Sequence, residues 1–179
     1  MIGNGFVWGQ SCHLVGWIVH VYSSNVKPQK AFCSMNHSAQ STVICENGVN
    51  MSLSGTALLP GYEHAKIRVG KRISIHIYGD DGAILYTGND EDLQSGKLEY
   101  MTGKDEGTII PDEECSKFQF ENTEVDGLGP ESLSNFIDAC LGKEDYYVGA
   151  DTLVGYQTVQ IVEALYRSST TGQVVDIKE

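Results

Sequence analysis

A tight hairpin near the middle of the chain constrains its fold more than any other feature. Alternating apolar residues end at Cys45 and resume at Val49, and Asn47-Gly48 lies between the two runs. Asn-Gly is the strongest short-range signal for a two-stranded hairpin, because both turn residues must tolerate a positive φ. This part of the chain is therefore predicted to be antiparallel β-structure.

A second hairpin is predicted shortly after the first. Ile73, Ile75 and Ile77 alternate with polar neighbours, Asp80-Asp81-Gly82 provides a turn, and residues 83–86 return the chain. Both hairpins have one apolar and one polar face, which is typical of an antiparallel sheet that is covered on one side.

Three helices are predicted around these strands. The first spans residues 9–22, and its apolar pattern consists of Val7 just before it and Leu14, Trp17, Ile18 and Tyr22 within it. The second carries an apolar stripe that we expect to face the core and to stop at Gly142: Leu133, Phe136, Ile137, Cys140 and Leu141. The third has Asp151 as its N-cap, ends near Ser168, and places these residues on one side: Val154, Thr158, Ile161, Val162 and Leu165.

The remaining segments complete an α+β fold. Residues 88–129 are acidic and rich in turns, with short strands expected at 98–101 and 108–110. Gly172 precedes a last short strand at Val174-Val175. We therefore expect residues 1–179 to form a single α+β domain, with a largely antiparallel, open-faced sheet and helices packed on one face.

Charge and cysteine content exclude several classes of partner. The chain has 24 acidic and 12 basic residues, a net charge of −12, which argues against binding to nucleic acid or to an anionic membrane surface. Its five cysteines form an odd set without a CxxC pair, as expected of a reduced, cytoplasmic protein. The apolar run at 14–22 is far shorter than the roughly 20 residues that span a bilayer.

Common cofactor motifs are missing. Gly3-Asn4-Gly5 does not open a dinucleotide-binding loop, because Trp8 stands where the third glycine is needed. The acidic clusters lack the spacing of a calcium loop and are interpreted as solvated surface: Asp80-Asp81, Asp90-Glu91-Asp92 and Asp112-Glu113-Glu114. We expect no metal and no cofactor to bind this chain itself.

His13 is the histidine of most interest. It follows a glycine-rich entry at the start of the first helix, and His20 lies about two helical turns further along the same face. Histidine titrates near neutrality and can exchange a proton with a substrate hydroxyl, although a purely structural role also fits. His76 alternates onto the polar side of its strand, at the surface or an interface.

Five stretches, in order along the chain, resemble the glucose–fructose oxidoreductase / inositol dehydrogenase (Gfo/Idh/MocA) family. The first, GNGFVWGQSCH at residues 3–13, is similar to the family's GGGxxxDxGxH segment. The others are CENGV, IYGDDGAI, NFIDA and the closing VEALYRSSTTGQVV, at residues 45–49, 77–84, 135–139 and 162–175.

The resemblance implies the second domain of such an enzyme, which forms the substrate side and the oligomer interface. NAD or NADP would be held by an upstream Rossmann domain. His13 falls on the family's active-site histidine, so it is expected to act in catalysis and, with Trp8 and Gln10, to bind a sugar-like or polyol substrate. Gly9 and Gly16 stand where the family has aspartates, which leaves a different substrate or a loss of catalysis open.

Two other functions are weighed against this one. The chain could be a non-catalytic module that forms a homo-oligomer through its sheet, with Ser74, His76 and Tyr78 at the interface. It could also be a ligand-binding α+β protein unrelated to the family.

Overall fold

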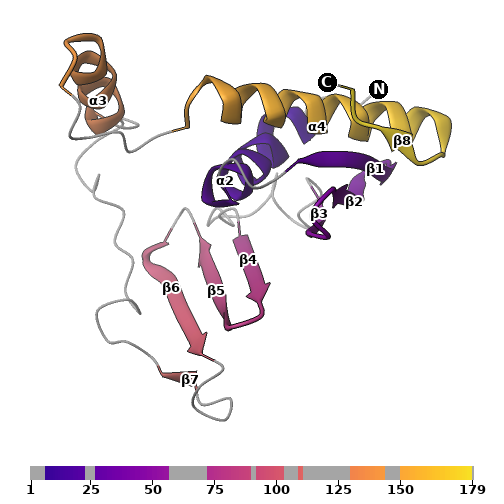
Figure 1. Cartoon of the computed structure of the whole chain (residues 1–179). Helices are drawn as coiled ribbons and strands as arrows, with labels where there is room; N and C mark the ends of the chain where they lie inside the picture. The colour runs from indigo at the N-terminus through magenta and orange to yellow at the C-terminus, as the bar shows by residue number, and fades with distance from the viewer. Residues whose placement is uncertain are drawn as a thin grey trace, which may run out of the picture. The chain divides into compact units, whose positions relative to one another are not determined.

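The computed structural model describes residues 7–22, 27–56, 72–89, 92–102, 109–110, 130–143 and 150–178 (Figure 1). The chain divides into two compact units. Met1–Leu59 and Ser134–Glu179 form the first unit, and Pro60–Leu133 form the second. The expectation that residues 1–179 make one domain stays a prediction.

The first unit combines a four-stranded sheet with two layers of helix. In chain order it contains η1 (Val7–Ser11), α2 (Cys12–Tyr22), β1 (Pro28–Met35), β2 (Ser38–Cys45), β3 (Asn50–Thr56), the part of α3 (Pro130–Cys140) from Ser134 onward, α4 (Thr152–Thr171) and β8 (Val175–Asp176). The strand order is β3-β2-β1-β8, and every pair is antiparallel. α4 packs on β1, and α2 packs on α4.

The first predicted hairpin is confirmed. Val43 on β2 pairs with Met51 on β3, and the backbone N–H of Cys45 donates to the carbonyl of Val49 over 2.9 Å. Gly48 has φ +83°, a conformation that residues with a side chain rarely adopt, which is why the turn needs glycine.

One face of this sheet forms the core. Along β1 to β3, the side chains of Ala31, Cys33, Val43 and Met51 are buried, while their neighbours along each strand are mostly exposed. The predicted stripe of α4 covers this face, and all five of its residues are buried. Among the described residues of this unit, the helices therefore lie on one side of the sheet, and side chains on its other side, such as Phe32 and Ile44, are exposed.

Both ends of α4 are as the sequence predicts. The Asp151 carboxylate accepts a hydrogen bond from the N–H of Val154 over 2.8 Å and so caps the first turn. The last turn closes at Gly172, whose φ of +67° is the left-handed conformation common at helix ends. The helix runs to Thr171, slightly beyond the predicted end near Ser168.

Ser168 joins α4 to the sheet. Its fully buried Oγ accepts from the N–H of Cys33 over 2.9 Å and donates to the carbonyl of Gln173 over 2.6 Å. β8 pairs with β1 only at Lys30 and Ala31, so Ser168 satisfies a backbone donor of β1 beyond the end of that pairing.

The N-terminal helix differs in part from its prediction. It consists of the π-helical turn η1 followed by α2, and its fully buried residues are Val7, Val15 and Val19. Trp17, which was predicted to be on the buried side, is 40% exposed. Val15 and Val19 are one turn apart and share the face toward α4, whereas Trp17 lies on the opposite side of the helix.

The second unit is an antiparallel sheet in the order β4-β5-β6-β7. Its strands are β4 (Arg72–Gly79), β5 (Gly82–Asn89), β6 (Asp92–Thr102) and β7 (Ile109–Ile110). The second predicted hairpin is confirmed by the pairing of Gly79 with Gly82 around a two-residue turn. The strand expected at 98–101 lies within β6, and the one at 108–110 matches β7 except for Thr108, which is outside the described residues.

The helix α3 (Pro130–Cys140) forms where the sequence predicts, but its apolar stripe is not buried. All five residues of the stripe are exposed, with Phe136 at 65%. The end at Gly142 is confirmed, since this residue has φ +69° and Lys143 donates its N–H to the carbonyl of Asp138. The prediction that this stripe faces the core is wrong, because periodicity shows that a helix face is apolar but not what covers it.

The fold class is α+β, as predicted. Across the described ranges, no helix has the length and apolar character of a membrane span. Several predicted features lie outside the described residues: Gly3-Asn4-Gly5, Asp90-Glu91, Asp112-Glu113-Glu114 and Cys115.

Candidate functional site

The three residues predicted for the site lie on one continuous helical segment. Trp8 and Gln10 belong to η1, and His13 lies in the first turn of α2. Val7 is fully buried and anchors the segment, while Trp8, Gln10 and His13 are exposed. A single π-helical turn that runs into an α-helix is uncommon and frequently occurs at functional sites.

Trp8 is fixed against α4. Its indole stacks on the ring of Tyr166, with ring centroids 6.0 Å apart and an interplanar angle of 17°. Burial raises the pKa of the Tyr166 hydroxyl, and the nearby Cys33 raises it further, while a hydrogen bond with the Trp8 backbone lowers it. Trp8 therefore serves as much to hold η1 in place as to present a ring to solvent.

One face of this helical segment is exposed and rich in polar and aromatic groups. Gln10, His13, Trp17 and His20 follow one another at intervals of three, four and three residues, the spacing of one helix face. All four are exposed. The shared face of His13 and His20 agrees with the prediction. The sequence analysis does not name Trp17 as a site residue, although its spacing from Gln10 and His13 indicates that it shares their helix face.

Gly16 lies where this segment contacts α4. A side chain built at this position would place its Cβ 3.4 Å from Oγ1 of the buried Thr158. A methyl group there would make an ordinary van der Waals contact with Thr158, so this position lies directly against α4. Gly16, where the family resemblance would place an aspartate, is thus a packing position in this chain.

The exposed face can bind a polar ligand and exchange a proton. His13 is accessible and is the side-chain type that titrates nearest to neutral pH. The Gln10 amide both donates and accepts hydrogen bonds, and the Trp17 ring offers a flat apolar surface. Among the described residues, no three His, Cys, Asp or Glu side chains are placed to hold a metal ion.

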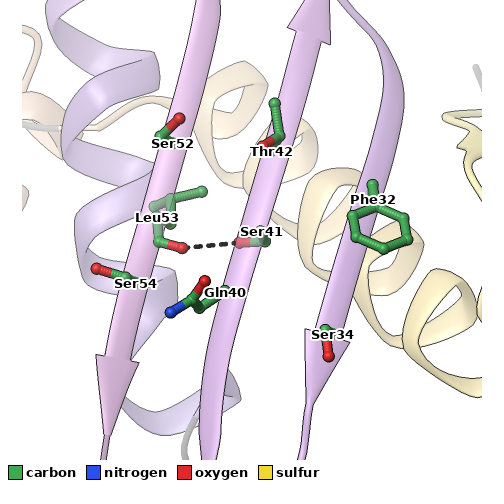
Figure 2. Close-up of a pocket in the computed structure, with 8 residues that line it drawn as sticks. All are labelled: Phe32, Ser34, Gln40, Ser41, Thr42, Ser52, Leu53 and Ser54. Carbon is green, nitrogen blue, oxygen red and sulfur yellow. Dashed lines mark hydrogen bonds between the residues drawn. The ribbon is translucent and has the colours of Figure 1, made fainter.

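A second surface was not anticipated from the sequence. On the open side of the first unit's sheet, a shallow pocket of about 320 Å³ is lined by residues of β1, β2 and β3. Figure 2 shows these residues on the three strands, with helices behind the sheet. They are Phe32, Ser34, Gln40, Ser41, Thr42, Ser52, Leu53 and Ser54. The polar positions of the alternating strands gave the only signal in the sequence.

His76 is exposed, as predicted, and contacts two hydroxyl groups on β4. Its Nε2 lies 3.0 Å from the Ser74 Oγ, and its Nδ1 lies 3.5 Å from the Tyr78 hydroxyl. The Tyr78 ring meets the imidazole edge-on and is 68% exposed. These groups lie in the second unit.

Comparison with known proteins identifies one matching family. Residues 28–177 match the model of the oxidoreductase family, C-terminal alpha/beta domain. Curated protein sequences give no significant match.

Solved structures of dehydrogenases share the fold. A levoglucosan dehydrogenase in complex with NADH and levoglucosan is similar over 96% of this chain and 50% of its own, with 15% identity and a TM-score of 0.64. The WlbA dehydrogenase from Bordetella pertussis, in complex with NADH and UDP-GlcNAcA, is similar over 97% and 46%, with 18% identity and a TM-score of 0.58.

An NAD binding oxidoreductase from Klebsiella pneumoniae is similar over 97% of this chain and 51% of its own, with 13% identity and a TM-score of 0.61. The chain thus spans about half the length of the solved structures that it matches. At such identities the likeness concerns the fold.

Proposed function

Since the chain belongs to the oxidoreductase family by its C-terminal alpha/beta domain, we propose that it forms the substrate-side half of an NAD(P)-dependent oxidoreductase. The proposed substrate is sugar-like or a polyol. Two of the similar structures support this class, since one contains levoglucosan and the other UDP-GlcNAcA, each together with NADH.

The observation that carries the proposal is the exposed face of η1 and α2. Its inner side is anchored by Val15 and Val19, so Gln10, His13 and Trp17 are presented on a rigid element. Rigid presentation matters because a proton-transfer group must be held within hydrogen-bond reach of the reacting hydroxyl. We propose that His13 accepts or returns that hydroxyl proton and that Gln10 and Trp8 help to bind the substrate.

The described residues do not fit a dinucleotide. The sequence contains no G-x-G-x-x-G, the fingerprint of a loop that places a pyrophosphate at a helix N-terminus. We therefore assign NAD or NADP to an upstream Rossmann domain and derive no step through it here. The free thiols among the described cysteines favour the cytoplasm as the compartment.

The test uses the longest form of the protein that its source produces. Intact mass shows whether a further domain accompanies residues 1–179, and NADH fluorescence titration measures dinucleotide binding. With sugars and polyols as substrates, His13→Ala should lower kcat by about 100-fold or more and leave cofactor affinity unchanged. His20→Ala, at the other end of the same face, is the matched control. Unchanged turnover in His13→Ala would remove this residue from the mechanism.

A second candidate function is self-association through β4. The observation that favours it is Tyr78, a largely exposed aromatic residue beside His76. Aromatic residues are enriched at protein interfaces. Light scattering over a concentration series should then show a dimer that Tyr78→Ala weakens and that Phe136→Ala, an equally exposed aromatic on α3, leaves intact. A monomer at every concentration contradicts this candidate.

A further inference from the structure

We propose that Tyr166 is a positioning residue for the candidate site, because it holds η1 in the orientation that presents Gln10 and His13. Tyr166 lies on α4, whereas the residues that it positions lie on η1 and α2. It therefore acts through the backbone of another element and not on a substrate. The inference rests on the proposed function, since it concerns the same site.

Tyr166 contacts Trp8 in two different ways. Its ring stacks on the indole of Trp8, with ring centroids 6.0 Å apart and an interplanar angle of 17°. Burial raises the pKa of its hydroxyl, and a hydrogen bond with the Trp8 backbone lowers it. A hydrogen bond lowers the pKa of a hydroxyl when the oxygen is the acceptor, so the Trp8 N–H is the donor.

This hydrogen bond acts as a helix cap. The first N–H groups of a helix have no acceptor within the helix itself, and Trp8 lies in the first turn of η1. An oxygen from α4 therefore satisfies a backbone donor at the start of the segment. One tyrosine thus fixes both the backbone and the side chain of Trp8.

Tyr166 is itself held by the surroundings of α4. It is partly buried and packs against the core of the unit. The next two residues bind other elements: Arg167 donates to the carbonyl of Asp176 over 2.8 Å, and Ser168 accepts from the N–H of Cys33. α4 is therefore tied at this point to β8 and to β1, and Tyr166 offers η1 a fixed partner.

Buried valines alone do not fix the orientation of the segment. Val7, Val15 and Val19 are at most 1% exposed and hold its inner side against the unit. Apolar contact has no preferred direction, whereas a hydrogen bond weakens steeply when its angle changes. Tyr166 therefore supplies the directional contact that keeps η1 from turning about its axis.

His13 depends on this orientation. Among the described residues, its imidazole has no hydrogen-bond or ring partner, so the backbone of the helical segment sets its place. A displacement of about 1 Å in a reacting group can cost about 100-fold in rate. Loosening of Trp8 is therefore expected to lower turnover while the imidazole itself is unchanged.

The test compares two hydroxyl deletions, Tyr166→Phe and Tyr22→Phe. The first keeps the ring that stacks on Trp8 and removes only the hydrogen bond. The second removes the hydroxyl of another half-buried tyrosine packed against the same core, at the far end of α2, and is the matched control. Both are made in the longest form of the protein that its source produces, and both are measured under conditions in which urea unfolding shows them fully folded.

Amide hydrogen exchange with mass spectrometry is the first readout, and it depends on no substrate. In Tyr166→Phe, the amides from Trp8 to His13 should exchange about tenfold faster, because opening the segment no longer breaks this hydrogen bond. The amides of β1 and β2 should stay as in the wild type. Tyr22→Phe should leave exchange from Trp8 to His13 unchanged.

Turnover is the second readout, with NAD⁺ and the sugar or polyol that the wild type oxidises. Tyr166→Phe should lower kcat by about tenfold or more and leave NADH affinity unchanged. The pH at which kcat/KM changes should stay as in the wild type, because His13 is still present. Since both variants are fully folded, a residue with only a structural role would leave kcat unchanged.

The proposal is overturned if Tyr166→Phe exchanges like Tyr22→Phe from Trp8 to His13, or if both variants have the same kcat. A wild type that oxidises no sugar or polyol contradicts the proposed function instead. Exchange then decides on Tyr166 by itself: faster exchange supports its hold on η1, and unchanged exchange overturns it.

Discussion

The helices α3 and α4 have the same kind of sequence pattern and opposite surroundings. Each carries five predicted stripe residues at helical spacing, and each ends at a glycine with positive φ. In α4 every stripe residue is buried against α2 or the sheet. In α3 every stripe residue is exposed. The difference lies in what each helix meets, which periodicity does not encode.

The comparison becomes quantitative through a matched pair of substitutions, Ile161→Ala on α4 and Ile137→Ala on α3. Ile161 is fully buried, so its truncation leaves a cavity and should lower the free energy of unfolding by about 2–5 kcal/mol. Ile137 is 48% exposed, and its replacement should change stability by only about 0.5 kcal/mol. Urea unfolding followed by circular dichroism measures both.

Equal losses for the two variants would break the comparison, because they would mean that α3 is also packed in solution. Phe136→Ser provides an independent check on α3. A polar replacement at an exposed apolar site costs little, whereas the same change beneath a covering element would destabilise by several kcal/mol. A large loss would therefore show that something covers this stripe.

A smaller loss in the free energy of unfolding is expected at Ser168. This residue joins α4 to the sheet through hydrogen bonds rather than through apolar contact, and α3 is exposed. Ser168→Ala leaves the N–H of Cys33 and the carbonyl of Gln173 without the partner they have now. We expect a loss of about 1–3 kcal/mol in the free energy of unfolding. Thr170→Ala removes an exposed hydroxyl that bonds within the helix, to the carbonyl of Tyr166, and is the control.

A neutral effect of Ser168→Ala would show that water or a backbone shift satisfies both groups. Amide hydrogen exchange at Cys33 shows whether its N–H has found a new partner or has none. An unsatisfied N–H on β1 should exchange faster while its neighbours stay protected.

Local features of the fold were predictable where a short segment determines them. The Asn47-Gly48 turn, the Asp151 cap and the Gly172 end each need only a few residues of known conformational preference. The surroundings of α3 and the exposure of Trp17 could not be predicted, because both depend on elements that are far apart in sequence.

The candidate site was predictable to a similar depth. A family resemblance named Trp8, Gln10 and His13, and the structure places all three on one exposed helical segment. Their roles stay predictions. The open-face pocket could not be predicted, since it requires the register that aligns Phe32, Thr42 and Ser52 across three neighbouring strands. Alternation of polar residues predicts which residues share one face of a strand, but not which residues of the adjacent strands lie next to them.

The smallest expected effect on stability comes from the cysteines, which also differ in exposure between the core beneath α4 and the helix α3. Burial raises the pKa of the Cys33 and Cys45 thiols above their ordinary value of 9.0, while Cys140 on α3 is exposed. In the unfolded chain, Cys33 and Cys45 ionise at the ordinary value. Their contribution to stability is therefore fully present below pH 9.0 and is lost as the pH rises through the higher pKa values of the folded state.

Urea unfolding at pH 8 and at pH 9.5 measures this loss, which a chain carrying both Cys33→Ala and Cys45→Ala should show less strongly. Alkylation by iodoacetamide at pH 8, followed by mass spectrometry, gives the second measurement. Cys140 should react first, and Cys33 and Cys45 only as fast as the core opens, because a buried neutral thiol is a poor nucleophile. If Cys140 is protected from alkylation as well as Cys33 is, then α3 is covered in solution. The two helices would then not differ in their exposure to solvent.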